Sequence, residues 1–266
     1  MHYELIPAHN PGPYTGAGNN TYLLNGKSPV LIDAGTGDSR HVTGVADALI
    51  QSPSTSLTKV LVTHGHTDHA SGISALMTRW PEVVAAKMPW PERDDRYSVF
   101  WTPIADGDLI PAGDTTLQAV HTPGHAPDHL CFLDSTSGVL FTGDLVVGGS
   151  TVMIPASSGG DLVAYLASLQ RVLSLKPTRL LPAHGPAIDD PATLVQHYLD
   201  HRQSREDQIL AAIRTGVDTV DGLVSHVYRF LDPQLIPAAR ESVLAHLKKL
   251  RVEERIQTDA NRWTST

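Results

Sequence analysis

One short turn, residues 63–69, concentrates side chains that bind metal ions. It holds His64, His66, Asp68 and His69 within six residues. Side chains two residues apart in extended backbone point the same way, so His64 and His66 can face one ion. Asp68 and His69 can reach a second ion from the turn into the next helix. Charged groups are costly to bury unless they are paired or metal-bound, so the turn predicts a metal site.

Three more potential ligands follow apolar runs that are typical of strands. They are His125 after Thr-Pro-Gly, Asp144 after Thr-Gly, and His184 before Gly185. With the first turn they supply five histidines and two aspartates, enough for two ions with Asp144 between them and positions left for water. We predict two Zn²⁺ ions per chain, with other divalent metals as alternatives.

Two adjacent ions would allow hydrolytic chemistry. Each lowers the pKa of bound water and can polarise a carbonyl or phosphoryl oxygen. The sequence therefore predicts a hydrolase that uses a metal-bridging hydroxide. Asp68 is the candidate to orient this nucleophile or to shuttle a proton, in addition to binding metal.

Four further residues are candidates to support the ligands or to contact the substrate. Asp33 ends a strand near the same edge, where it could accept a hydrogen bond from a ligand histidine or cap backbone amides of a turn. His129 could orient His125 or line the site. His201 and Arg202 lie on a predicted helix soon after His184 and could bind an anionic substrate group. Seven other histidines are interpreted as surface or core residues: His2, His9, His41, His121, His197, His226 and His246.

The elements that must position these residues alternate with Gly/Pro-rich turns along the first 188 residues. The spacing of apolar residues predicts strands at 21–25, 29–35, 59–64, 116–124, 129–134, 139–144 and 179–185. It predicts helices at 41–51, 71–81 and 160–177. Residues 88–101 could be a lid over the site or a loop packed on the core. Residues 148–160 suit a loop that lines the substrate.

From residue 189 the pattern changes to helices. We expect helices at 190–215, 219–229 and 235–251, followed by a short hairpin over 254–266. Three helices and a ribbon are the outline of a winged-helix-like module. The predicted organisation is a catalytic domain over 1–188 and a C-terminal module over 189–266.

Composition limits the classes of function. The 266 residues are 41% hydrophobic and 18% charged, which is ordinary for a soluble globular protein. No apolar run reaches the ~20 residues of a membrane helix, and no secretory signal is visible. The single cysteine, Cys131, cannot form an internal disulfide and is predicted to lie in the core. We predict a cytoplasmic protein that does not interact with membranes.

The charge is unevenly distributed. Residues 201–266 hold 10 Lys/Arg against 9 Asp/Glu, whereas residues 1–200 hold 10 against 19. A non-specific nucleic-acid binder presents many cations to phosphates. Any phosphate-binding surface must therefore be local, and the C-terminal part is the better candidate.

The metal motifs resemble the metallo-β-lactamase superfamily, whose signature matches the pattern His64-x-His66-x-Asp68-His69. The resemblance implies an α/β fold, a four-layer αββα sandwich with the metals at one edge. It also implies that the first ion is held by His64, His66 and His125, the second by Asp68, His69 and His184, and that Asp144 bridges them.

Within the superfamily the chain is most similar to the β-lactamase-like protein 2 branch. The matching segments are 10–13, 20–23, 122–129, 198–210 and 239–247, so the resemblance spans nearly the whole chain. It implies a C-terminal winged-helix-like module. Gly65 departs from the branch, where an aromatic residue is common, and this departure concerns substrate contacts rather than metal binding.

Several functions are compatible with these residues. The first is hydrolysis of a small ester, thioester or lactone, which the acidic catalytic part favours. The second, implied by the branch, is cleavage of single-stranded RNA. Its phosphate contacts would be the basic residues Arg202, Arg205, Lys248, Lys249, Arg251 and Arg255. Pairing of these cations with neighbouring acidic residues is the interpretation we favour.

Two other functions are weaker candidates. Dedicated β-lactamases usually carry cysteine or serine where Asp144 stands, so lactam hydrolysis would be a side activity. A non-enzymatic regulator would not need open metal positions. A homodimer, in which the C-terminal module contributes to dimerisation or to substrate binding, is a further possibility.

Overall fold

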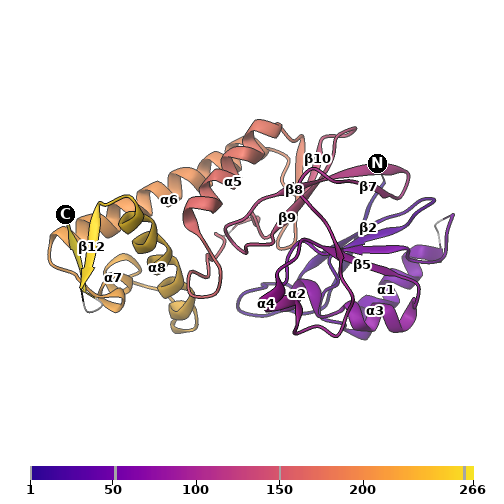
Figure 1. Ribbon diagram of the computed structural model, residues 1–266, viewed down its shortest axis with the longest axis horizontal. Coiled ribbons are helices and arrows are strands. Elements are labelled where there is room, and N and C mark those ends of the chain that lie inside the picture. The colour runs from indigo at the N-terminus through magenta and orange to yellow at the C-terminus, as the bar shows by residue number, and fades with distance from the viewer. Residues whose placement is uncertain (1, 51–52, 150, 260–261) are drawn as a thin grey trace.

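A computed structural model describes residues 2–50, 53–149, 151–259 and 262–266 (Figure 1). Two sheets pack face to face and helices cover both outer sides, which confirms the predicted αββα sandwich. A smaller helical module with a two-stranded ribbon follows at the C-terminal end. No helix of the described residues is both long and apolar enough to cross a bilayer.

The first sheet has the strand order β1-β2-β3-β4-β5-β6. Strands β1 to β3 pair antiparallel and β3 to β6 pair parallel, with α1 and α3 as crossover helices. The strands are β1 (Glu4–Pro7), β2 (Asn20–Leu24), β3 (Val30–Ile32), β4 (Lys59–Leu61), β5 (Val84–Lys87) and β6 (Thr102–Pro103). The carboxyl ends of the parallel strands share one edge, so the turns after β3 and β4 meet there.

The second sheet has the order β11-β10-β9-β8-β7 and is antiparallel except for the β10–β11 pair. Its strands are β7 (Leu109–Ala112), β8 (Thr115–His121), β9 (Leu130–Asp134), β10 (Val139–Gly143) and β11 (Arg179–Pro182). The parallel β10–β11 pair brings the residues that follow both strands to the same edge. Asp144 and His184 therefore become neighbours although they are far apart in sequence.

Alternation along the strands creates three layers of core. In β2, Tyr22 and Leu24 face the other sheet while Leu23 faces the outer helices. In β9, Phe132 faces the first sheet while Cys131 and Leu133 face outward. Because both faces of each sheet are buried, the strands contain apolar runs rather than polar alternation. Cys131 is buried, as predicted.

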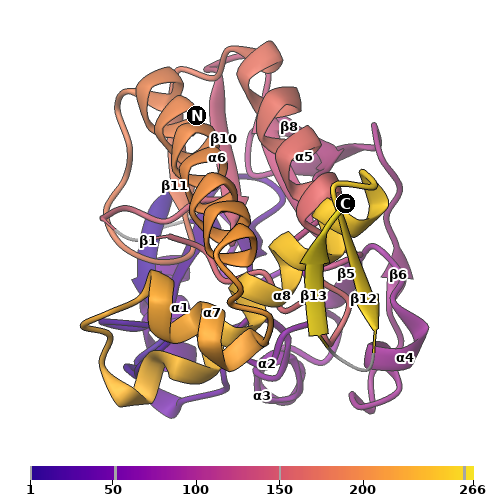
Figure 2. The same cartoon turned by 90° about the vertical axis from the view of Figure 1, so that its left-hand side faces the viewer.

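The outer layers are formed by helices with one apolar face. Helices α1 (Ser39–Ile50) and α3 (Ile73–Arg79) cover the first sheet, and α5 (Leu162–Leu175) with the beginning of α6 (Pro191–Arg214) covers the second (Figure 2). The Asp161 carboxylate caps α5 by accepting from the Ala164 amide, and Lys176 in left-handed conformation ends the helix before Pro177.

Helix α6 connects the two parts of the molecule. Val195 and Tyr198, near its start, belong to the core of the sandwich, whereas Ile209 and Ile213 belong to the core of the C-terminal module. That module also contains α7 (Val220–Val227), a 3₁₀ turn (Pro233–Leu235), α8 (Ile236–Val252) and the ribbon β12 (Ile256–Asp259) with β13 (Arg262–Ser265). The predicted boundary between residues 188 and 189 stays a prediction.

The predicted helices and the C-terminal hairpin are present with shifted ends. The main difference is at 71–81, where the structure has α2 (Thr67–Ala70) and then α3, because the ligand turn itself begins the helical backbone. Gln51 of the predicted helix 41–51, Ser150 of the predicted loop 148–160, and Ala260 and Asn261 of the hairpin lie outside the described residues.

Candidate metal centre

All seven predicted ligands converge at one edge of the sandwich, in two groups. One group contains His64, His66 and His125, and the other contains Asp68, His69, Asp144 and His184. Within each group the candidate ligand atoms lie within 4.8 Å of one another. They come from the turn after β4, from α2, and from the turns after β8, β10 and β11. The strand-end geometry inferred from the sequence is therefore present in three dimensions.

The first group presents nitrogen lone pairs to a common point. His66 Nδ1 lies 2.9 Å from His64 Nε2 and 2.9 Å from His125 Nε2. The outer Nδ1 of His125 is 2.8 Å from the Met153 carbonyl, and that of His64 is 3.1 Å from the Thr63 hydroxyl. A neutral imidazole that donates from its outer nitrogen turns its lone pair inward. Burial lowers the pKa of His64, and lowers that of His66 to about 2, so both stay in the form that binds metal.

The second group combines imidazoles with carboxylates. His69 Nε2 lies 3.4 Å from Asp68, and His184 Nε2 lies 3.3 Å from Asp144. Burial opposes charge on both rings, yet the carboxylate of Asp68 raises the pKa of His69 and that of Asp144 raises the pKa of His184 to about 10. The raised pKa of both rings reflects the attraction of these carboxylates for a positive charge. A bound metal ion would satisfy the same charges.

Asp144 lies between the two groups. Its Oδ1 is 3.3 Å from His184 Nε2, and its Oδ2 is 3.5 Å from His125 Nε2. The Asp144 amide donates to His129 Nε2 at 3.1 Å, which fixes the backbone at this point. Gly143 has φ of +47°, and a Cβ there would lie 2.9 Å from the same His129 nitrogen. The donor set of imidazoles and carboxylates fits two adjacent ions of the zinc or iron type.

Asp33 fulfils both roles considered for it. Its Oδ2 accepts from His69 Nδ1 at 2.8 Å, and its Oδ1 accepts from the Thr63 amide at 2.8 Å. It thereby aims His69 Nε2 at the second group and holds the turn that precedes His64. His129 does not contact His125 through a hydrogen bond; its Nδ1 pairs with the Thr122 hydroxyl at 2.8 Å and its Nε2 holds Asp144.

Two supporting pairs had no signal in the sequence. The Asn19 amide lies 3.2 Å from the Asp68 carboxylate and is itself held by Asn10. Buried Lys87 pairs with Asp128 at 2.9 Å, and Asp128 accepts from the Gly65 amide between two ligands at 2.8 Å. Single asparagines and lysines are common, so only their contacts identify them.

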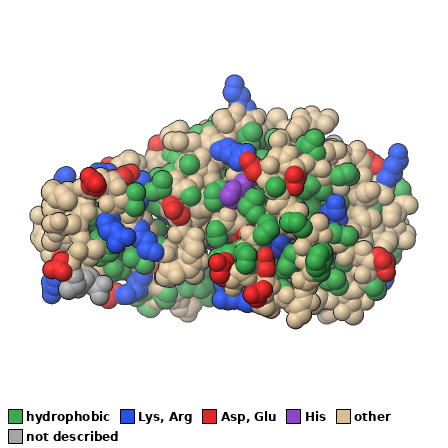
Figure 3. All heavy atoms as spheres, in the orientation of Figure 1, with side chains coloured by type: hydrophobic (Ala, Val, Ile, Leu, Met, Phe, Trp, Pro, Cys, Tyr) green, Lys and Arg blue, Asp and Glu red, His purple; other side chains and the backbone are tan. Residues whose placement is uncertain are grey.

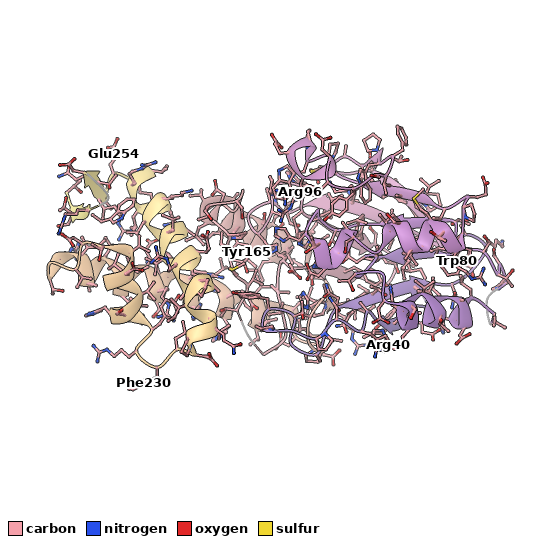
Figure 4. The ribbon with its side chains drawn as sticks, turned by 90° about the horizontal axis from the view of Figure 1, so that it is seen from below. Arg40, Trp80, Arg96, Tyr165, Phe230 and Glu254 are labelled. Atoms are coloured by element: carbon pink, nitrogen blue, oxygen red, sulfur yellow. The ribbon has the colours of Figure 1, made fainter. Side chains whose placement is uncertain are left out.

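A cavity of about 590 Å³ opens over the two groups. The sandwich contributes His66, Asp68, Arg93, His125, Asp144 and His184 to its lining. The C-terminal module contributes an apolar wall, defined here as Tyr228, Leu231, Leu235, Ala238 and Ala239. In Figure 4, Tyr165 lies where the two parts meet and Phe230 lies at the outer rim of the module. Substrate would therefore contact both parts of the chain.

The loop 148–160 lines this cavity through Gly148, Thr151, Val152, Met153, Pro155 and Ser158, as its composition suggested. Helix α8 anchors the loop, because Glu241 accepts from the Ser157 amide at 2.8 Å and Lys248 donates to the Ala156 carbonyl. Met153 in turn accepts from His125. The C-terminal module thus supports one wall of the metal centre.

His201 and Arg202 are not among the described residues that line the cavity. The Arg202 guanidinium points inward, lies over the Tyr165 ring at 5.4 Å and donates to the Val152 carbonyl. Its position therefore corrects the expectation that Arg202 binds an anionic substrate group, because the guanidinium is bonded to the loop 148–160 instead. His201 is half-buried on the same helix, and Arg202 is among the nearby charges that, after burial, lower its pKa to about 4.

The segment 88–101 is packed on the sandwich for most of its length. Tyr97, Val99 and Trp101 contact the core of the first sheet, and the Tyr97 hydroxyl donates to the Gly65 carbonyl at 3.0 Å. Its short helix α4 (Pro91–Asp94) nevertheless brings Arg93 to the cavity. The segment combines the two alternatives, a packed loop and one side of the site.

Comparison with known proteins agrees with this geometry. Residues 14–184 match the model of the metallo-β-lactamase superfamily, and residues 219–263 match that of the β-lactamase associated winged helix domain. A β-lactamase-like protein 2 homolog of Drosophila melanogaster is 32% identical over 93% of this chain and 87% of its own length. An atrochrysone carboxyl ACP thioesterase of Aspergillus fumigatus is 35% identical over 77% of this chain and 62% of its own length.

A solved structure has the same arrangement along the whole chain. It is a metallo-β-lactamase family protein from Thermus thermophilus, with a TM-score of 0.82 and 20% identity over 99% of this chain and 98% of that one. The sandwich and the C-terminal module therefore occur together in both proteins. The chain belongs to the metallo-β-lactamase superfamily of metal-dependent hydrolases and carries the winged helix domain associated with it.

Proposed function

We propose that this chain is a dinuclear zinc hydrolase of a small ester, thioester or lactone, with a thioester as the preferred class. The observation that carries the proposal is that both ligand groups contribute residues to the lining of one cavity that also has an apolar wall. When bound, two zinc ions would supply Lewis acidity toward the substrate oxygen and lower the pKa of water. The seven ligands are assigned as His64, His66 and His125 to the first ion, Asp68, His69 and His184 to the second, and Asp144 to both.

The residues of the chain would perform the remaining tasks. Asp68 is held by Asn19 and borders the cavity, so we assign it to orient the attacking water and to accept its proton. Asp33 fixes the ring of His69, and Met153 fixes that of His125. The apolar wall would bind the acyl or thiol part of the substrate and exclude water from it.

The relatives support the thioester class. The A. fumigatus relative is named as a thioesterase that acts on an acyl carrier protein substrate, and it covers most of the sandwich of this chain. In hydrolysis of a thioester, water adds to the carbonyl carbon, the C–S bond breaks, and an acid and a thiol leave. The wall formed by the C-terminal module suits an apolar chain on either product.

RNA cleavage is less compatible with the surface. Of the six cations considered for phosphate contacts, Lys249 and Arg255 pair with Glu206 at 2.7 and 2.6 Å. Arg202, Arg205 and Lys248 donate to main-chain carbonyls. On the face shown in Figure 3, basic and acidic side chains are interspersed over both parts of the molecule. A continuous phosphate-binding track would require free cations.

The proposal is tested with protein stripped by chelator and reloaded with Zn²⁺, Fe²⁺ or Mn²⁺. Bound metal is counted by elemental analysis, and hydrolysis is measured on a thioester, an ester, a lactone, nitrocefin and a labelled single-stranded RNA. We expect two ions per chain and metal-dependent release of thiol. RNA or lactam as the best substrate would contradict the proposed class, and activity that survives complete removal of metal would contradict the mechanism.

The bridging assignment has its own variant. Asp144→Ala should lose one ion or both and reduce turnover by more than the ~10–100-fold typical of changes beside a metal ligand. Asp47→Ala, which changes an exposed carboxylate on α1, is the matched control. Full activity of Asp144→Ala with both ions retained would refute the assignment.

Cytoplasmic location and a homodimer stay predictions.

A further inference from the structure

Arg93 is the one Lys or Arg side chain among the described residues that line the cavity. It lies on α4, whose first turn is fixed by hydrogen bonds of the Trp90 carbonyl with the amides of Arg93 and Asp94. The guanidinium carbon is 5.2 Å from the centre of the Trp90 ring, and that ring is 6.1 Å from the ring of His66. The cation is therefore held beside the first ligand group.

The absence of a side chain at Gly65 makes this position available. A Cβ on Gly65 would lie 3.1 Å from Arg93 Cγ and 3.5 Å from Trp90 Cε3. A larger side chain at this position would occupy the space through which the Arg93 stem passes. The glycine at position 65 therefore leaves the room that allows the Arg93 side chain to lie beside the candidate metal centre.

No group of the described chain neutralises Arg93. Its Nε is buried and has no hydrogen-bond partner, and none of the described carboxylates forms an ion pair with the guanidinium. Two acidic residues flank Arg93 on α4: Glu92 is exposed and forms no ion pair with it, and Asp94 is paired with Lys87 at 2.6 Å. Buried Asp128 is also paired with Lys87, at 2.9 Å. A partly desolvated cation without an anionic partner is unfavourable in the free protein, and a bound anion would relieve that cost.

We propose that Arg93 is the specificity-determining anion site of this cavity, and that the hydrolysed ester or thioester carries a free carboxylate which Arg93 binds. This inference rests on the proposed function. One guanidinium matches the single charge and planar shape of a carboxylate, whereas the described lining offers no second Lys or Arg beside Arg93 for the second charge of a phosphate dianion. The substrate then spans the cavity from Arg93 to the apolar wall.

A binding experiment tests the anion site without turnover. Glutarate is titrated into the metal-loaded protein by calorimetry, with inorganic phosphate in a parallel series. We expect Arg93→Gln to weaken glutarate binding by ~10-fold or more, and Arg93→Lys to weaken it less, because charge remains but the planar fork is lost. Arg96→Gln, an exposed neighbour outside the cavity lining, should bind glutarate like the unchanged protein.

The outcomes separate the possibilities. Equal glutarate affinity in Arg93→Gln and in the unchanged protein would overturn the proposal. Phosphate bound more tightly than glutarate, and lost with Arg93, would overturn the carboxylate assignment in favour of a phosphate ester. A second variant changes Gly65. Gly65→Phe should weaken glutarate binding as Arg93→Gln does, because the added ring fills the space of the Arg93 stem.

Turnover then links the anion site to the reaction. The glutaryl and pentanoyl thioesters of N-acetylcysteamine differ in one carboxylate, and thiol release measures kcat/KM for each. We expect the unchanged protein to prefer the glutaryl thioester, and this ratio to fall toward one in Arg93→Gln but not in Arg96→Gln. Arg93-dependent glutarate binding without cleavage of either thioester would contradict the proposed function and leave the anion site intact. A ratio that does not depend on Arg93 would contradict the specificity role.

Discussion

The Asp33 carboxylate accepts a hydrogen bond from His69 Nδ1 at 2.8 Å, and both side chains are buried. This contact determines which ring nitrogen of His69 faces the second ligand group. Asp33 has φ of +64°, so the chain adopts a left-handed conformation to place the carboxylate there. A strained backbone at this point is consistent with a role beyond that of a turn.

Asp33→Asn should weaken metal binding at the second group by ~10–100-fold, because a neutral amide holds the imidazole less firmly and does not raise its basicity. Metal affinity is measured by competition with a chromophoric chelator. Asp47→Asn, an exposed carboxylate on α1, is the control. Unchanged affinity for both ions would show that Asp33 acts only as a cap of the Thr63 amide.

Arg202→Met should weaken binding of the first metal ion, although Arg202 is not itself a candidate ligand. Arg202 holds the Val152 carbonyl, and the adjacent Met153 carbonyl accepts from the ligand His125. Loss of that anchor frees the loop, so we expect ~10-fold weaker binding of the first ion and a smaller effect on the second. Arg214→Met at the other end of α6 is the control. If both ions are lost equally, the effect is on the fold rather than on His125.

Lys87→Met should destabilise the sandwich strongly. The variant leaves Asp94 and Asp128 without their shared cation, and Asp128 is fully buried. Removal of one partner of a buried ion pair costs ~3–5 kcal/mol in the free energy of unfolding. Urea unfolding of metal-loaded protein measures it, with exposed Lys27→Met as the control. Addition of Asp128→Asn to Lys87→Met should restore part of the lost free energy of unfolding. If Lys87→Met alone is as stable as the original protein, the ion pair is excluded as a stabilising contact.

The C-terminal module should lose stability in acid through Glu206. Burial alone would raise the pKa of Glu206, but the neighbouring His246 and Lys249 lower it from 4.5 to about 2. Because the folded-state pKa is depressed, the contribution of Glu206 is complete above pH 4.5 and is lost as the pH falls toward 2.

The measurement for Glu206 is a difference between variants, since ligand histidines also release metal in acid. Urea unfolding of the original protein and of Glu206→Gln is followed from pH 6 to the lowest pH at which both fold. We expect the original protein to have the higher free energy of unfolding, by on the order of 2 kcal/mol at neutral pH, and this difference to narrow below pH 4.5. Glu82→Gln, on the surface of the sandwich, should show no such difference. A difference in the free energy of unfolding that grows in acid would contradict the lowered pKa of Glu206 in the folded protein.

The sequence alone predicted the candidate ligand set and determined the layered fold. Four of the candidate ligands lie in one six-residue turn, so local backbone geometry already brings them together. The other three follow strands, and strands of a sheet end at shared edges. Apolar periodicity also identified the helices α5, α6 and α8, because burial of one face repeats at short intervals along the chain.

Tertiary structure alone decided which groups surround the metal centre. The contacts of Arg93 with Gly65, of Arg202 with Val152 and of Lys87 with Asp128 join residues that are 28, 50 and 41 positions apart. Nothing in the local sequence fixes whether such a cation points into a cavity or into the core. That depends on packing between layers and between the two parts of the chain, which forms only when distant segments meet.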